Sequence, residues 1–139
     1  MISAFYRHPN WDTALRRLHA IVPSAEGFLP DQIYRAEPVE GHRLDREDRT
    51  DAAIAEDLWA LVPKPSSGLL IIVTEASWGP DFHGPFFIDA ELLDAFISEH
   101  PERAGHAFFE GDVIILEPDS ERLIVVHHEG VAWSFTLDH

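Results

Sequence analysis

Three closely spaced β-strands near the C-terminal end of the sequence constrain the fold more than any other feature. Residues 112–117, 122–128 and 131–137 are rich in β-branched, aliphatic and aromatic side chains, which favour strands. The tripeptide Pro118-Asp119-Ser120 fits a type I turn, and Glu129-Gly130 fits a two-residue hairpin loop. Because connections this short join antiparallel neighbours, the sequence predicts an antiparallel three-strand meander.

In the last of these strands, large apolar side chains alternate with small or polar ones. One face carries Val131, Trp133, Phe135 and Leu137, and the other carries Ala132, Ser134 and Thr136. Since successive side chains of a strand point to opposite faces, we expect the first face to be core and the second to be wet. Helices should then pack on one face of the sheet, which gives an α+β fold.

Three upstream segments have helical periodicity: residues 11–22, a segment that ends near residue 62, and residues 90–100. Each follows a residue that can cap a helix and is followed by a proline. The expected caps are Asn10, then Asp45 or Thr50, then Asp89. The meander and about three helices therefore account for most of the chain.

Other segments give weaker or shorter patterns. Residues 69–73 are apolar on both faces, which is typical of a central strand covered on two sides. Short strands are suggested within 28–35 and at 86–88. The mixed-charge run 42–50 is expected to be a solvated loop or helix entry.

The length and composition favour one cytoplasmic domain that spans residues 1–139. A chain of 139 residues with 45% hydrophobic residues can bury a core of its own. Cysteine is absent, so disulfides, thiolate nucleophiles and Cys-ligated zinc are excluded. The first residues lack the features of a signal peptide, and the apolar runs are shorter than the ~20 residues that span a bilayer.

Acidic residues are unevenly distributed along the chain, whose formal net charge is −15. Residues 1–50 hold 7 Arg and 8 Asp or Glu, whereas residues 51–139 hold 3 Lys or Arg and 17 Asp or Glu. Such a field repels nucleic acid and anionic membranes and speeds association with basic proteins. Solubility and adaptation to high salt are the alternatives, although salt adaptation should spread acid along the whole chain.

Nine histidines call for a search for a metal site. His127 and His128 are adjacent in a predicted strand, so they should point to opposite faces and not bind one ion together. His127 and Glu129 share a face, and the fold would have to bring in His83 or His106 as a third ligand. Because no His-Glu-x-x-His or EF-hand pattern is present, the sequence predicts no metal or other cofactor.

Catalytic and phosphate-binding motifs are also lacking. Ser77, Asp81 and His83 lie close in sequence, but no Gly-x-Ser-x-Gly elbow surrounds the serine. The glycines form no phosphate-cradling pattern, and no basic patch interleaved with aromatics points to nucleic acid. The sequence therefore predicts a binding protein and not an enzyme.

Two surfaces are candidates for partner binding. One is the loop that starts at residue 78, where aromatic anchors are combined with charge. The other is the edge of the meander with its acidic turns. The residues expected to bind a partner are Trp78, Asp81, Phe82, His83, Glu110, Asp112 and Glu129. Packing of the aromatics into the core and simple solvation of the acids are the alternatives.

The stretches 111–116 (GDVIIL) and 123–130 (LIVVHHEG) resemble the C-terminal meander of small cytoplasmic immunity proteins that bacteria pair with polymorphic or contact-dependent toxins. The resemblance covers the last third of the chain. It implies a single-domain inhibitor without enzymatic activity that covers a toxin's active site or a neighbouring surface.

On this basis we expect an immunity protein that inhibits a basic, nuclease-type toxin by electrostatic steering and active-site occlusion. The alternative is a small metal-binding or hydrolytic enzyme domain that uses His83, His127 and Glu129. An acidic mimic of DNA and a regulatory accessory domain also stay open, and the sequence does not indicate an oligomeric state.

Overall fold

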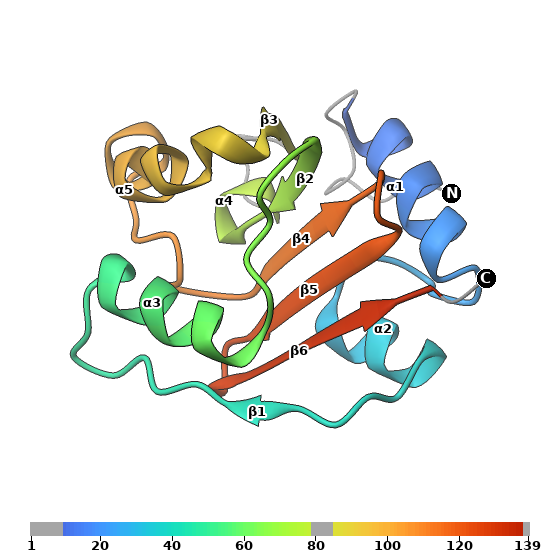
Figure 1. The fold of residues 1–139 in the computed structure, drawn as a ribbon, viewed down its shortest axis with the longest axis horizontal. Helices are drawn as coiled ribbons and strands as arrows, with labels where there is room; N and C mark the ends of the chain where they lie inside the picture. The colour runs from blue at the N-terminus through green and yellow to red at the C-terminus, as the bar shows by residue number, and fades with distance from the viewer. Residues whose placement is uncertain (1–9, 79–84, 138–139) are drawn as a thin grey trace.

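A six-stranded antiparallel sheet forms the centre of the computed structural model, which describes residues 10–78 and 85–137 (Figure 1). Its strands are β1 (His42–Arg43), β2 (Leu69–Val73), β3 (Phe86–Asp89), β4 (Val113–Glu117), β5 (Arg122–His127) and β6 (Val131–Thr136). They lie in the order β1-β6-β5-β4-β2-β3, and every neighbouring pair is antiparallel. The predicted meander is β4-β5-β6, and the α+β class is confirmed.

The hairpin loop between β5 and β6 is one residue longer than predicted. His127 pairs with Val131, so His128, Glu129 and Gly130 form the loop. The N–H of Gly130 donates to the carbonyl of His127 at 2.9 Å, and Gly130 has a φ of 89°, which glycine adopts readily. Three-residue loops that end in such a glycine are common in hairpins, and this one places His128 outside the strand.

Six helical segments flank the sheet within the described residues. They are α1 (Asn10–Ile21), α2 (Pro30–Ala36), α3 (Asp51–Leu61), α4 (Glu75–Trp78), the 3₁₀ helix η2 (Ala90–Leu92) and α5 (Leu93–Ala104). The predicted helices correspond to α1, α3 and α5. Thr50, and not Asp45, caps α3, because its Oγ1 accepts the N–H of Ala53 at 3.2 Å. No helix in this part of the chain has the length and apolar character needed to cross a membrane.

Among the local predictions that differ from the structure, two concern the positions of helices. The helix α2 replaces the strand suggested within 28–35, since it begins at Pro30 and has Asp31 in its first turn, and both residue types favour a helix start. The helix α5 continues beyond Pro101 to Ala104. It ends where Gly105 adopts a φ of 83°, the left-handed conformation that often closes a helix.

Helices cover both faces of the sheet, and the prediction that they pack on one face is wrong. Residues of α1 and α2 form a core on one face, whereas residues of α3 and α5 form a second core on the other face. The cause lies in β4 and β5, where successive residues are apolar. Ile114 belongs to the first core and Ile115 to the second, and both are buried.

The strand β6 follows the same two-sided pattern near its start. Trp133 lies in the core under α1 and α2, as expected for the apolar face. Ala132, which was expected on a wet face, is fully buried in the core under α3 and α5. A small apolar residue fits a covered face as well as a wet one, so the alternation in this strand was ambiguous.

Candidate functional site

A hollow of about 440 Å³ opens beside the β5–β6 loop. That loop, the segment from β1 to the start of α3, and the segment before β4 contribute its walls. We call it the charged hollow, because eight ionisable side chains line it together with His128: Arg43, Asp45, Arg46, Glu47, Arg49, Asp51, Glu110 and Glu129.

Two arginines of the charged hollow are engaged within the protein. Arg46 donates through Nη1 to the carbonyl of Phe109 and through Nη2 to the carbonyl of His128. It thereby joins the segment before β4 to the β5–β6 loop. Arg49 forms an ion pair with Asp57, and this hydrogen bond raises the pKa of Arg49 above its usual value. Both guanidinium groups are therefore engaged by groups of the protein itself.

Asp51 holds the segment before β4 from another side. Its carboxylate accepts the N–H of Phe108 at 2.8 Å and the N–H of Phe109 at 3.2 Å. Four other carboxylates of the hollow are exposed to solvent, and we call them the acidic rim: Asp45, Glu47, Glu110 and Glu129. Arg43 is the exposed cation among them.

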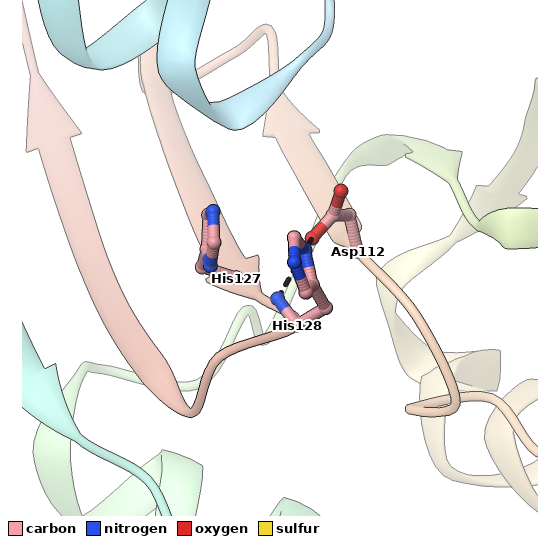
Figure 2. A group of neighbouring side chains, drawn as sticks. All are labelled: Asp112, His127 and His128. Carbon is pink, nitrogen blue, oxygen red and sulfur yellow. Dashed lines mark hydrogen bonds and ion pairs between the residues drawn. The ribbon is translucent and has the colours of Figure 1, made fainter.

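Asp112, His127 and His128 form a cluster where β5 ends, next to the charged hollow (Figure 2). Oδ1 of Asp112 accepts the backbone N–H of His128 at 2.7 Å and lies 2.9 Å from Nδ1 of that residue. The two imidazole rings stack with their centroids 4.3 Å apart and an interplanar angle of 26°. Each residue of the cluster offers one potential ligand atom, and these atoms all lie within 4.8 Å of one another.

The prediction that His127 and His128 point to opposite faces is wrong. Alternation holds within a strand, but β5 ends at His127, and His128 belongs to the loop. Glu129 contacts His127 through a hydrogen bond in which the backbone N–H of Glu129 donates to Nδ1 of His127 at 3.0 Å. Nε2 of His127 lies 3.7 Å from Oδ1 of Asp31 in α2, so two elements far apart in sequence flank this ring.

Three of the residues predicted to bind a partner lie at this end of the molecule. Glu110 and Glu129 line the charged hollow, and Asp112 is bonded to His128, which lines it too. Trp78 is the last residue of α4. The other three predicted residues, Asp81, Phe82 and His83, lie outside the described residues.

His106, considered as a third metal ligand, lies elsewhere. Its Nδ1 is 3.5 Å from Oε2 of Glu110, and its ring packs against His100 with the centroids 5.2 Å apart. The set with potential metal-ligand spacing among the described residues is therefore Asp112, His127 and His128.

Sequence reasoning missed the roles of Arg46, Asp51 and His128. The mixed-charge run 42–50 is expected to be a solvated loop or helix entry, yet Arg46 within it forms a hydrogen bond with a carbonyl 63 positions away. Asp51, which follows the run, accepts an N–H 57 positions away. The density of arginine in this run was the available signal. His128 was assigned to a strand because the hairpin loop was predicted one residue too short.

A scan against models of protein families, a search of curated proteins and a search of solved structures each found no match to this chain. The interpretation of the site therefore depends on its own geometry and charge.

Proposed function

We propose that this chain is a non-enzymatic protein-binding module, an immunity-type protein of the cytoplasm that inhibits a basic, nuclease-type toxin. The observation that carries the proposal is the acidic rim. Four exposed carboxylates surround one hollow, and two of the arginines beside them are engaged by backbone carbonyls or by Asp57. A basic protein that approaches this end meets carboxylates that are available for new ion pairs.

The side chains of the rim suit recognition of Lys and Arg. Among the described residues, Glu47 and Glu129 have no ion-pair partner. The side chain of Glu110 is 61% exposed and lies 3.5 Å from His106. Exposed carboxylates accept two parallel hydrogen bonds from a guanidinium group, which adds geometric specificity to charge attraction.

The charge of the chain favours fast association. A net charge of −15 produces a field that steers a cationic partner and raises its association rate. Charges on the surface act over roughly 8 Å at physiological ionic strength, so the carboxylates at the contact itself govern the final approach. Inhibition then follows when the bound chain occludes the partner's nucleic-acid site.

Preorganisation of the hollow supports tight binding. Arg46 and Asp51 fix the backbone of two walls through hydrogen bonds to Phe108, Phe109 and His128. A surface that is ordered before binding loses less conformational entropy when the partner docks.

The test uses the whole chain and two charge-reversed variants. Glu110→Lys combined with Glu129→Lys alters the rim. Glu26→Lys combined with Glu91→Lys is the matched control, because it adds the same charge at two exposed sites outside the hollow. A basic protein retained by the wild type at low salt is identified, purified separately and measured for association rate, salt dependence and nuclease activity.

We expect the rim variant to associate about tenfold more slowly than the control and with a flatter salt dependence. We also expect stoichiometric wild-type chain to abolish the partner's nuclease activity. Equal association rates for the rim variant and the control would show that the rim is not part of the interface. A partner that keeps its activity in the complex would contradict the immunity function itself.

A further inference from the structure

The cluster of Asp112, His127 and His128 has the composition of a transition-metal site. We propose that these three residues bind one divalent transition-metal ion, and that Zn²⁺ is preferred over the hard cations Mg²⁺ and Ca²⁺. Two imidazoles and one carboxylate are typical ligands of zinc, nickel and copper, whereas Mg²⁺ and Ca²⁺ take oxygen ligands. Three protein ligands leave a fourth position for water or for a group from another molecule.

The potential ligand atoms of Asp112 and His128 lie close to the separation that binding one metal ion requires. Metal–ligand bonds of about 2.1 Å in a tetrahedral arrangement separate the ligand atoms by about 3.4 Å. Nδ1 of His128 and Oδ1 of Asp112 are 2.9 Å apart, so an ion can take the place of the proton between them after a small expansion. The potential ligand nitrogen of His127 lies at most 4.8 Å from the other two ligand atoms. A small rotation of its ring would bring it to the same ion.

The backbone and the packing hold two of the ligands in place. Oδ1 of Asp112 also accepts the backbone N–H of His128 at 2.7 Å, which orients the carboxylate. The side chains of Asp112 and His127 are 19% and 14% exposed, whereas that of His128 is 56% exposed. Two ligands are therefore mostly enclosed, and the third is accessible to an ion from solvent.

The surrounding charges favour a cation on balance. Asp31 approaches the cluster from α2, with its Oδ1 3.7 Å from Nε2 of His127, and the whole chain is strongly acidic. Arg46 opposes binding, since it donates to the carbonyl of His128. The carboxylates of the acidic rim line the same hollow as Arg46 and partly offset its positive charge.

The backbone N–H of Glu129 provides a reporter for the bound ion. It donates to Nδ1 of His127 at 3.0 Å, which requires the neutral tautomer with its proton on Nε2. Binding through Nδ1 displaces this hydrogen bond directly. Binding through Nε2 moves the ring proton to Nδ1, so the same hydrogen bond is lost in either case.

The test uses the complete chain without a histidine tag, after treatment with a chelator. Calorimetry measures binding of Zn²⁺ and Mg²⁺, and visible absorption follows Co²⁺ as a spectroscopic substitute for zinc. The variants are His127→Gln and His128→Gln. His42→Gln is the matched control, because His42 is exposed on β1 and lies outside the cluster.

We expect one Zn²⁺ per chain, negligible binding of Mg²⁺ and a visible band with Co²⁺. Each cluster variant should weaken Zn²⁺ binding by about tenfold or more, as loss of a ligand costs at least as much as loss of an outer-shell partner. His42→Gln should bind like the wild type. In amide NMR spectra, zinc should shift the Glu129 resonance of the wild type, and the dispersion of each variant's spectrum reports its folding.

Three results would contradict the proposed metal site. One is absence of Zn²⁺ binding by the wild-type chain. Another is equal loss of affinity in His42→Gln and in the folded cluster variants. The third is zinc binding that leaves the Glu129 amide unchanged. Because each measurement uses the isolated chain, failure of the metal site leaves the proposed partner binding untouched, and the reverse is also true.

Discussion

The carboxylate of Asp51, the first residue of α3, accepts the backbone N–H of Phe108 at 2.8 Å across 57 positions of sequence. The ring of Phe108 is fully buried in the core under α3 and α5. The contact therefore connects the start of a helix to a segment whose side chain is anchored in that core. It is one of the long-range bonds that give the charged hollow a fixed wall.

Replacing Asp51 should destabilise the fold. Asp51→Ala removes the acceptor of two backbone N–H groups, and we expect the free energy of unfolding to fall by about 2 kcal/mol. Urea denaturation measures the change. Glu26→Ala, at an exposed position, serves as the control and should stay within about 0.5 kcal/mol of the wild type. A similarly small effect at Asp51 would contradict the structural role.

Replacing Arg46 should loosen the two segments that it joins. A lysine in Arg46→Lys presents one ammonium group, which cannot reproduce the forked geometry that reaches two separate carbonyls. We expect faster hydrogen exchange at the amides of Glu110 and Gly130, whose hydrogen bonds close the two joined segments. Arg43→Lys is the matched control at an exposed position. Unchanged exchange at both amides in Arg46→Lys would argue against the proposed link.

The cap of α3 provides a prediction that separates two sequence candidates. Thr50→Ala should lower the free energy of unfolding by about 1 kcal/mol, because it removes the oxygen that accepts the N–H of Ala53. Asp45→Ala should have a smaller effect, since Asp45 bonds instead to the N–H of Glu47 at 3.2 Å. Thermal and urea denaturation of the two variants give the comparison. The opposite ranking would place the cap at Asp45.

Two glycines with similar positive φ angles allow strain to be separated from crowding. Gly130 and Gly105 have φ values of 89° and 83°. A Cβ on Gly130 would lie 3.0 Å from the carbonyl oxygen of Leu44, whereas a Cβ on Gly105 would meet nothing within 4 Å. We expect Gly105→Ala to cost about 1–2 kcal/mol from its left-handed conformation, and Gly130→Ala to cost more. Equal losses in urea denaturation would show that the Leu44 contact adds no strain.

Local signals were sufficient to predict the meander and the three longest helices among the described residues. The signals that succeeded are local, because each depends on residues close by in the sequence. They are the apolar run at 69–73, the paired strands 113–117 and 122–127, and the proline at position 63 that follows α3. Thr50 was one of two predicted caps, and the structure selects it. Patterns of this kind depend on periodicity and turn chemistry, which a single sequence contains.

The two-sided cover of the sheet was harder to predict. The alternation in β6 indicated one wet face, but Ala132 is compatible with either environment and is buried. In β4, by contrast, Ile114 and Ile115 lie on opposite faces and are both apolar, which indicates that both faces of the sheet are covered. When two strands of one sheet disagree, the strand with large apolar residues on both faces is the better guide to how the sheet is covered.

The site was predicted only in part. Glu110, Asp112 and Glu129 were selected because acidic turns stood out in the sequence, and they lie at one end of the molecule. The bond from Arg46 to the carbonyl of His128 spans 82 positions, and such a contact leaves no periodic trace in the sequence. The position of His128 depended on a hairpin loop of three residues where two were predicted.

The frame of the charged hollow and its acidic rim use different side chains. Arg46 and Asp51 hold the backbone, whereas Glu47, Glu110 and Glu129 project from that backbone into solvent. Substitutions on the rim should therefore be tolerated by the fold. If the proposed partner binding holds, a gene duplicate could diverge toward a new partner by a few rim substitutions while it keeps the same scaffold, so diversification would be concentrated in these positions.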